Sequence, residues 1–153
     1  MPPHLRPLDT APALLQSVQK LYRAARKARM RAYERYSGFA VGAAVMTRNG
    51  RIFTGVNVEG VDYDVTHAEE SAISAMRLAT SEPPSMIVAV GGKADVRPED
   101  APIIPPCGKC RQKIYEWIIG DPQADIDVIV RNPETGEIVF CSIRELLPLS
   151  FGG

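Results

Sequence analysis

The sequence predicts an α/β fold in which helices cover both faces of a five-stranded mixed sheet, a three-layer α/β/α arrangement. Two observations carry this prediction. Segments with apolar residues at helical spacing alternate with short β-prone runs, in the order α-β-β-α-β-α-β-β-α. The chain has 153 residues, of which 45% are hydrophobic, which suits one domain with a substantial core. We therefore expect a single domain over residues 1–153.

The first element is expected to be an amphipathic helix behind a loosely ordered lead-in. Residues 1–9 contain three prolines and little else, and Thr10 suits the N-cap of a helix with Pro12 just inside it. Apolar residues then recur at helical spacing up to about Arg35. The other face is rich in Lys and Arg. We interpret it as a solvated face, because a platform for single-stranded nucleic acid would interleave aromatic residues with those charges.

Two strands are expected next, over Phe39–Met46 and Ile52–Val58, because the Asn-Gly pair between them is the strongest short hairpin signal. Asn57 and Glu59 follow at the end of the second strand. They share one face, since residues i and i+2 of a strand point the same way. The pair is either a ligand clamp or a turn-stabilising Asn beside a solvated Glu, and the local sequence leaves both open.

The rest of the chain alternates helices and strands. The expected elements are a helix over His67–Thr80 capped by Thr66, a buried strand over Met86–Val90, a helix over Cys107–Ile119, strands over Ile126–Arg131 and Glu137–Cys141, and a short helix opened by the capping box Ser142–Glu145. The candidate chemistry lies at the starts of the two longer helices.

Three potential metal ligands occur at these helix starts. Cys107 and Cys110 are three positions apart in the first turn of a helix, where side chains point toward a common spot, so the thiols form a chelating pair. His67 adds a third ligand of a type that zinc prefers, and a catalytic zinc site leaves its fourth position to water. Glu69 stands two residues after the histidine, where a carboxylate can serve as general acid and base without being a ligand.

Two other interpretations of the Cys-x-x-Cys pair stay open. A closed structural zinc site needs a fourth Cys or His, and the chain offers only His4, in the proline-containing lead-in, and Cys141, in an apolar run. A redox pair would not require a His-x-Glu at a second helix start. We favour an open catalytic site with one zinc per chain. His-x-Glu followed by Pro-Cys-x-x-Cys is also the signature of zinc deaminases that act on nucleobases.

The chain resembles the cytidine deaminase family from about Ala32 to Phe151. The matching segments are Tyr36-Ser37-Gly38-Phe39, Val41-Gly42-Ala43-Ala44, Gly50-Arg51-Ile52-Phe53, Asn57-Val58-Glu59, His67-Ala68-Glu69, Pro106-Cys107-Gly108-Lys109-Cys110-Arg111-Gln112 and Glu145-Leu146-Leu147-Pro148. The resemblance implies the cytidine-deaminase-like fold. It also implies hydrolysis of cytidine or deoxycytidine to uridine or deoxyuridine, with release of ammonia, as a step of pyrimidine salvage.

The same resemblance implies substrate contacts. Asn57 and Glu59 would hold the ribose hydroxyls, Phe39 would stack near the pyrimidine, and Ala68 would contact the base through its backbone.

The resemblance further implies a homotetramer with shared active sites. Tyr63 and Phe151 would complete neighbouring sites across its subunit interfaces.

Three departures from the family pattern affect the site. His67 stands where small tetrameric members usually carry a third Cys, and Glu70 stands where they carry an Arg. The two changes fit together, because a third thiolate would make the site anionic and call for a cation, whereas an imidazole leaves no excess charge. The stretch from Tyr63 to His67 is also one residue shorter than usual, and Gly60 replaces an Asn. We therefore expect a reshaped loop over the ribose.

Composition narrows the function classes. Lys and Arg number 18, as do Asp and Glu, so no net field draws the chain to nucleic acid or to a membrane. Three cysteines, with two assigned to a metal, favour a reducing compartment. The N-terminus lacks a signal-peptide core, and no apolar run is long enough for a membrane span, so we expect a cytoplasmic location.

Two further interpretations are kept beside the cytidine deaminase. One is a deaminase of a blasticidin-type cytosine antibiotic, which typically lacks the ribose-clamping carboxylate, so Glu59 argues against it. The other is a catalytically dead binding module scaffolded by zinc, which should have lost Glu69.

Overall fold

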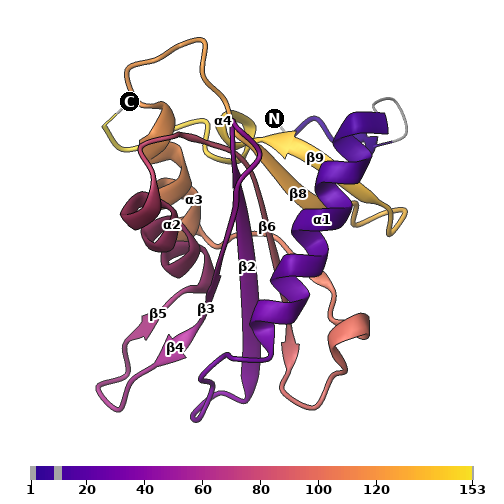
Figure 1. Cartoon of the computed structure of the whole chain (residues 1–153), viewed down its shortest axis with the longest axis vertical. Helices are drawn as coiled ribbons and strands as arrows, with labels where there is room; N and C mark the ends of the chain where they lie inside the picture. The colour runs from indigo at the N-terminus through magenta and orange to yellow at the C-terminus, as the bar shows by residue number, and fades with distance from the viewer. Residues whose placement is uncertain (1–2, 9–11, 153) are drawn as a thin grey trace.

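The computed structural model describes residues 3–8 and 12–152 (Figure 1). A mixed sheet forms its middle layer, with the strand order β1-β9-β8-β6-β2-β3 and with β7 paired to β6. Strands β4 and β5 form a separate two-stranded sheet. The strands span β1 Arg6–Pro7, β2 Phe39–Thr47, β3 Ile52–Val56, β4 Val58–Glu59, β5 Val65–Thr66, β6 Pro84–Lys93, β7 Ile103–Ile104, β8 Asp127–Arg131 and β9 Ile138–Ser142.

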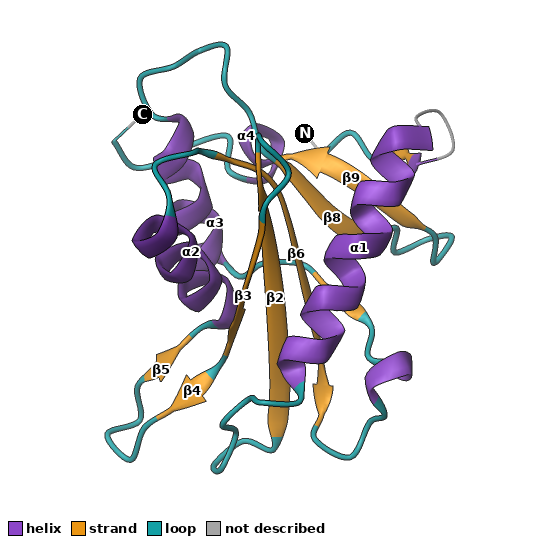
Figure 2. Ribbon diagram, viewed as in Figure 1, coloured by secondary structure: helices purple, strands orange, loops and turns teal. Residues whose placement is uncertain are grey.

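Helices cover both faces of the main sheet (Figures 1 and 2). One core cluster includes apolar residues of α1 and the other includes those of α2 and α3, so α1 lies on one face and α2 and α3 lie on the opposite face. The three-layer α/β/α prediction is confirmed. The helices are α1 Pro12–Arg29, α2 Ala68–Ala79, α3 Gly108–Tyr115 and α4 Ile143–Leu146, with short 3₁₀ turns η2 Pro98–Asp100 and η3 Glu116–Ile118. In the described part of the chain, no helix is long and apolar enough to cross a membrane.

All five predicted strands are present, as β2, β3, β6, β8 and β9. The count of five is wrong for the described residues, because the two-residue strands β1 and β7 also join the sheet. Strands so short carry no alternating pattern that a sequence could show. Strand β6 pairs antiparallel with β2 and parallel with β8, so the sheet is mixed as expected.

The lead-in is partly attached to the sheet, which corrects the prediction of a loose segment. Arg6 and Pro7 pair antiparallel with β9 at the sheet edge, where a proline is tolerated because an edge strand need not donate every N–H. Leu8 is buried in the core beside α1. Thr10, the predicted N-cap of α1, lies outside the described residues.

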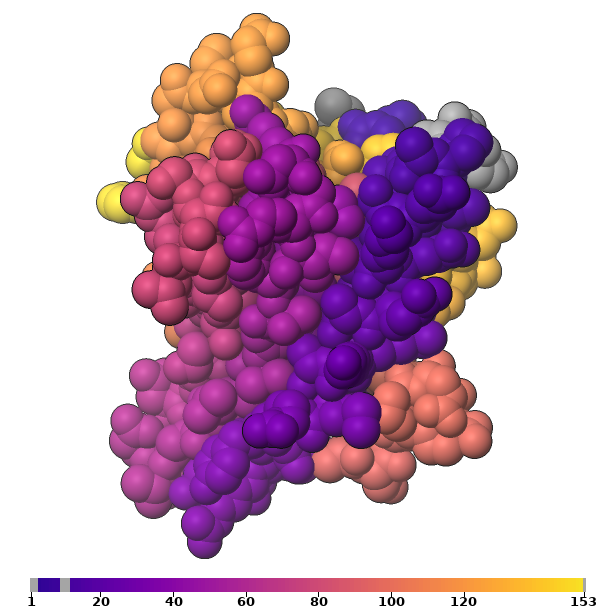
Figure 3. All heavy atoms as spheres, in the orientation of Figure 1, coloured from indigo at the N-terminus to yellow at the C-terminus, as the bar shows by residue number. Residues whose placement is uncertain are grey.

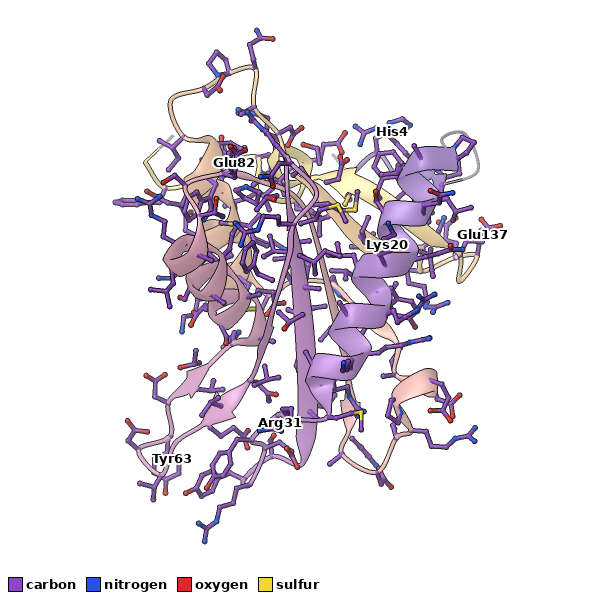
Figure 4. All side chains as sticks on the ribbon, in the orientation of Figure 1. His4, Lys20, Arg31, Tyr63, Glu82 and Glu137 are labelled. Atoms are coloured by element: carbon purple, nitrogen blue, oxygen red, sulfur yellow. The ribbon has the colours of Figure 1, made fainter. Side chains whose placement is uncertain are left out.

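Helix α1 ends at Arg29 rather than near Arg35, and the last residue of the helix is buried. The guanidinium of Arg29 donates hydrogen bonds to four backbone carbonyls, those of Ala40, Gly92, Lys93 and Val96. Arg29 is therefore a structural tie between β2 and the end of β6. The other basic residues of this face are exposed or half-buried, as Lys20 on α1 illustrates (Figure 4).

Close backbone contacts set the positions of the helices over the sheet. A Cβ atom at Gly42 would lie 2.2 Å from the carbonyl oxygen of Ala25 in α1. One at Gly55 would lie 2.2 Å from the amide nitrogen of Ala72 in α2. Only glycine permits such an approach. Gly55 thereby lets α2 pack directly on β3, which places the first turn of α2 beside the end of that strand.

Candidate metal centre and adjoining cavity

The candidate metal centre lies where α2 and α3 begin. His67 is the N-cap residue of α2 and Cys107 is the N-cap residue of α3, and neither side chain caps its own helix. Both side chains are therefore available to a ligand. Cys110 follows in the first turn of α3 and is buried. Thr66, the predicted cap, belongs to β5 instead, so α2 begins one residue later than expected.

The three donor atoms are spaced as a zinc ion requires. His67 Nδ1 lies 3.4 Å from Cys107 Sγ and 3.3 Å from Cys110 Sγ. Zinc bonds of about 2.3 Å to sulfur and about 2.0 Å to nitrogen put sulfur and nitrogen about 3.5 Å apart around a tetrahedral ion. The donor atoms lie within 4.8 Å of one another, and within the described residues this is the one such group of three. The residues present therefore fit zinc.

Neither candidate for a fourth protein ligand belongs to this group. Cys141 is buried in the core, its Sγ lies 3.8 Å from the carbonyl oxygen of Val128, and burial raises the pKa of its thiol to about 11. His4 is on the N-terminal segment (Figure 4) and does not belong to the group of three. The arrangement in the described chain is that of an open, three-ligand site.

Glu69 lies in the first turn of α2 beside the thiols. Its side chain is buried, and its Oε2 accepts a hydrogen bond of 3.4 Å from Cys110 Sγ. Burial, and after it the Glu69 carboxylate, raises the pKa of Cys110 well above the usual thiol value. Desolvation of the buried thiol and the nearby carboxylate both favour the protonated form. Metal binding at Cys110 must therefore displace a proton.

A cavity of about 330 Å³ opens beside the metal ligands. This volume is in the range of small-molecule sites. The wall includes seven of the predicted site residues: Phe39, Asn57, Glu59, His67, Ala68, Glu69 and Cys107. Five further residues of the wall were not singled out from the sequence, and they are Ser37, Val41, Val65, Ile104 and Pro105.

The side chain of Asn57, at the edge of the cavity, forms hydrogen bonds with the backbone of β2. It is buried; its Oδ1 accepts a hydrogen bond of 2.8 Å from the amide of Val41, and its Nδ2 donates one of 2.8 Å to the carbonyl of Phe39. An amide has one further N–H and one further lone pair to offer. These bonds tie Asn57 to β2, which is distant in sequence, and not to a local turn as weighed from the sequence. A ligand contact is still chemically available to the side chain.

Glu59 is presented to the cavity as a carboxylate. Its Oε1 accepts hydrogen bonds of 3.0 Å from the backbone amides of Tyr36 and Ser37. Hydrogen bonds from Ser37, followed by the one from Tyr36, lower the pKa of Glu59. The chain segment that precedes β2 thus holds a charged acceptor in place before any substrate arrives.

Tyr63 and Phe151 do not line the cavity. Tyr63 sits in the loop that joins β4 to β5, with a left-handed φ of 65°, and its side chain is fully exposed (Figure 4). Figure 3 shows this part of the chain projecting from the body at the lower left. Phe151 is 87% exposed, and its backbone is held by the side chain of Gln112.

Glu70, the second departure in the metal motif, pairs with a lysine between the two cysteines. Glu70 Oε1 lies 2.9 Å from Lys109 Nζ. The hydrogen bond with Glu70 is the main reason why the pKa of Lys109 is raised, and Asp64 adds a smaller contribution. Sequence reasoning identified Glu70 but missed its partner, because the two residues are distant in the chain.

Comparison with known families identifies relatives of the chain. The family model for the cytidine and deoxycytidylate deaminase zinc-binding region matches residues 15–122. A cytidine deaminase of Halalkalibacterium halodurans is 36% identical over 133 residues, covering 87% of this chain and 92% of that protein. A cytidine deaminase of Mycobacterium tuberculosis is 37% identical over 122 residues, covering 79% of each.

Solved structures agree with the fold. The crystal structure of cytidine deaminase from M. tuberculosis matches with a TM-score of 0.70 at 30% identity, covering 89% of this chain and 98% of that one. That of cytidine deaminase from Burkholderia pseudomallei matches with a TM-score of 0.69 at 36% identity, covering 87% and 98%. The fold therefore occurs in cytidine deaminases over nearly their whole length.

Proposed function

The chain belongs to the cytidine and deoxycytidylate deaminase family, and we propose that it hydrolyses cytidine and deoxycytidine to uridine and deoxyuridine, releasing ammonia. One observation carries the proposal: a buried carboxylate, Glu69, lies beside three zinc-type ligands on the wall of a cavity of nucleoside size. The layered body supports treating residues 1–153 as one deaminase domain.

His67, Cys107 and Cys110 would hold one zinc per chain. When bound, zinc supplies the Lewis acidity that lowers the pKa of water and makes it a nucleophile near neutral pH. The two thiolates and the neutral imidazole offset the charge of the ion, so this set needs no Arg beside it. That accounts for the presence of Glu70 where the family usually has a cation.

Glu69 would move the protons of the reaction. The attacking water adds its oxygen to C4 of the pyrimidine, the C4–N bond to the amino group breaks, and ammonia leaves. Glu69 would take one proton from water and give it to the ring nitrogen next to C4. It would then take the proton of the oxygen added at C4, which becomes the carbonyl oxygen of uridine, and pass it to the departing amine. Such general acid and base catalysis is typically worth about a hundred- to ten-thousandfold.

The remaining wall suits a nucleoside. Glu59 would accept hydrogen bonds from the ribose hydroxyls, and Asn57 would donate to them. Phe39 would cover the pyrimidine, and the backbone of Ala68 would contact the base. Among the described residues, the wall contains two carboxylates, Glu59 and Glu69, and no Lys or Arg. A 5′-phosphate would therefore meet repulsion and no cation, which favours nucleosides over nucleotides.

The exposed aromatic residues support a further part of the proposal, a homotetramer in which neighbouring subunits complete each site. Tyr63, Phe151 and the nearly uncovered Leu149 place large apolar side chains in solvent. Burial at a subunit interface would stabilise them. Light scattering of the purified protein measures the assembly directly.

We also propose a cytoplasmic location and a role in pyrimidine salvage. Cys107, Cys110 and Cys141 are free thiols, and two of them are needed as metal ligands. A reducing compartment would keep them in that form.

A substrate panel tests the function. Zinc-loaded protein is incubated with cytidine, deoxycytidine, deoxycytidine monophosphate, free cytosine and blasticidin S, and ammonia release is measured. We expect the two nucleosides to react and the other three to react poorly. The blasticidin-type alternative is not favoured, because the relatives cited above carry the name cytidine deaminase. Preferential reaction of blasticidin S or of the monophosphate would contradict the proposal.

A further inference from the structure

A salt bridge joins the two helix starts that carry the metal ligands. Lys109 Nζ lies 2.9 Å from Glu70 Oε1. Lys109 is in the first turn of α3, between the two cysteines, and Glu70 is in the first turn of α2, directly after Glu69. The ion pair therefore crosses the same gap between α2 and α3 that the ligands cross.

The place of Lys109 in its helix is unfavourable without a partner. The N-terminus of a helix carries positive partial charge, which disfavours a cation and favours an anion. The first turn of α3 has no acidic residue, whereas that of α2 has Glu69 and Glu70. The lysine side chain is 49% exposed, yet it turns to Glu70, which is only 16% exposed. The contact to the neighbouring helix offsets the cost of the cation at this position.

We propose that the Glu70–Lys109 ion pair is a clamp that holds the starts of α2 and α3 at the separation zinc binding requires. The inference rests on the proposed zinc deaminase function and identifies two positioning residues for its metal site. His67 comes from one helix start and both cysteines from the other, so their distances of 3.3 and 3.4 Å depend on how these helix starts are placed. Contacts that orient metal ligands are typically worth about ten- to a hundredfold in metal affinity.

A purely electrostatic role makes a different prediction. Loss of the negative charge of Glu70 would weaken binding of a cation, and loss of the positive charge of Lys109 would strengthen it. A clamp fails when either partner is removed. The direction of the Lys109 effect therefore separates the two roles.

The test measures zinc affinity of the metal-free full chain by competition with a chromogenic chelator. We expect Glu70→Gln and Lys109→Met each to bind zinc about tenfold more weakly than wild type, the low end of effects on ligand-orienting contacts. The double variant should bind about as weakly as either single one, since both remove the same interaction. Lys109→Arg, which keeps the charge and can keep the pair, should bind nearly as wild type.

Asp64→Asn is the matched control. Like Glu70→Gln, it removes one negative charge, and Asp64 also contributes to the electrostatic field at Lys109. Unlike Glu70→Gln, it leaves the Glu70–Lys109 salt bridge intact. We expect its zinc affinity to stay within about twofold of wild type, because exposed charges are strongly screened.

Tighter zinc binding by Lys109→Met, additive losses in the double variant, or wild-type affinity in both single variants would overturn the clamp. Melting curves followed by circular dichroism identify any variant that fails to fold, and Lys109→Arg then remains as a test: a tenfold loss in this folded variant also counts against the clamp. A wild-type protein that binds zinc but does not deaminate cytidine would refute the function and leave the clamp standing.

Discussion

The metal end of the cavity, at His67, Cys107 and Glu69, and its proposed sugar end, at Glu59, are built in different ways. His67, Cys107 and Glu69 sit at helix starts that are packed on the sheet, and Glu69 is buried. The sugar end is formed by the short strand β4 and the loop to β5, with Glu59 half-buried and Tyr63 fully exposed. The three candidate metal ligands of the metal end come from one chain, whereas the sugar end leaves the large side chain of Tyr63 exposed.

This difference separates two tasks. Under the proposed function, rigid elements would hold the groups that react, and a more open segment would hold the groups that recognise the sugar. Changes at the metal end should therefore slow every substrate equally. Changes at the sugar end should affect only substrates that have a sugar, and the predictions below use this contrast.

The largest effect is expected from removal of a metal ligand. Cys110→Ala should lose most of its zinc and, with it, turnover of both cytidine and cytosine, because two ligands hold the ion poorly. Cys141→Ala should keep its zinc, since this thiol lies in the core away from the site. Metal analysis after purification decides the point. Equal zinc content in the two variants would refute the assignment of ligands.

The second-largest effect is expected from Glu69→Gln. The variant should fold and bind zinc, yet lose about a hundred- to ten-thousandfold in kcat, because it cannot transfer protons. Glu82→Gln, an exposed residue beyond the end of α2, serves as its control and should turn over normally. Comparable kcat values for the two variants would show that the buried carboxylate is not the proton carrier.

At the sugar end, Glu59→Ala should lower kcat/KM for cytidine by about ten- to a hundredfold, since a hydrogen bond to a charged group is typically worth about 1.5–3 kcal/mol. The slow rate on free cytosine should hardly change. If both rates fell together, the contrast between the two ends would fail.

Wild-type protein should likewise prefer cytidine strongly over cytosine, and equal rates would make Glu59 and Asn57 purely structural.

The smallest effect concerns pH. The pKa of Glu59 is lowered by its hydrogen bonds, so the carboxylate stays charged below the pH at which an ordinary Glu, with a pKa of about 4.3, takes up a proton. Binding of the product uridine should therefore be nearly constant from about pH 5 to 8 and weaken only as the pH falls through the lowered pKa. Calorimetric titration checks this. Weakening near pH 6 would mean that the lowered pKa does not govern sugar binding.

The metal end was the more predictable of the two from sequence. Its metal ligands were predicted from the short spacings of Cys-x-x-Cys and His-x-Glu at two helix starts. At a helix start, the local backbone alone sets the direction of the side chains. Helix α2 and the β2–β3 hairpin, with Gly50 at a φ of 86°, were predicted from equally local signals.

Features that depend on distant segments were missed. The buried Arg29 donates hydrogen bonds to backbone carbonyls that are distant in sequence. Lys109 of α3 forms an ion pair with Glu70 of α2. The strands β1 and β7 exist only because longer strands accept them. Local periodicity contains no information on any of these contacts.

Zinc-dependent deamination of cytidine is best tested by removing the metal and returning it. The protein is stripped with a chelator, assayed with cytidine, and assayed again after addition of one equivalent of zinc, while uridine and ammonia are both measured. We expect no product from the stripped protein and, after zinc is restored, uridine and ammonia in equal amounts. Cytidine turnover that persists without zinc, or uridine formed without ammonia, would contradict this expectation.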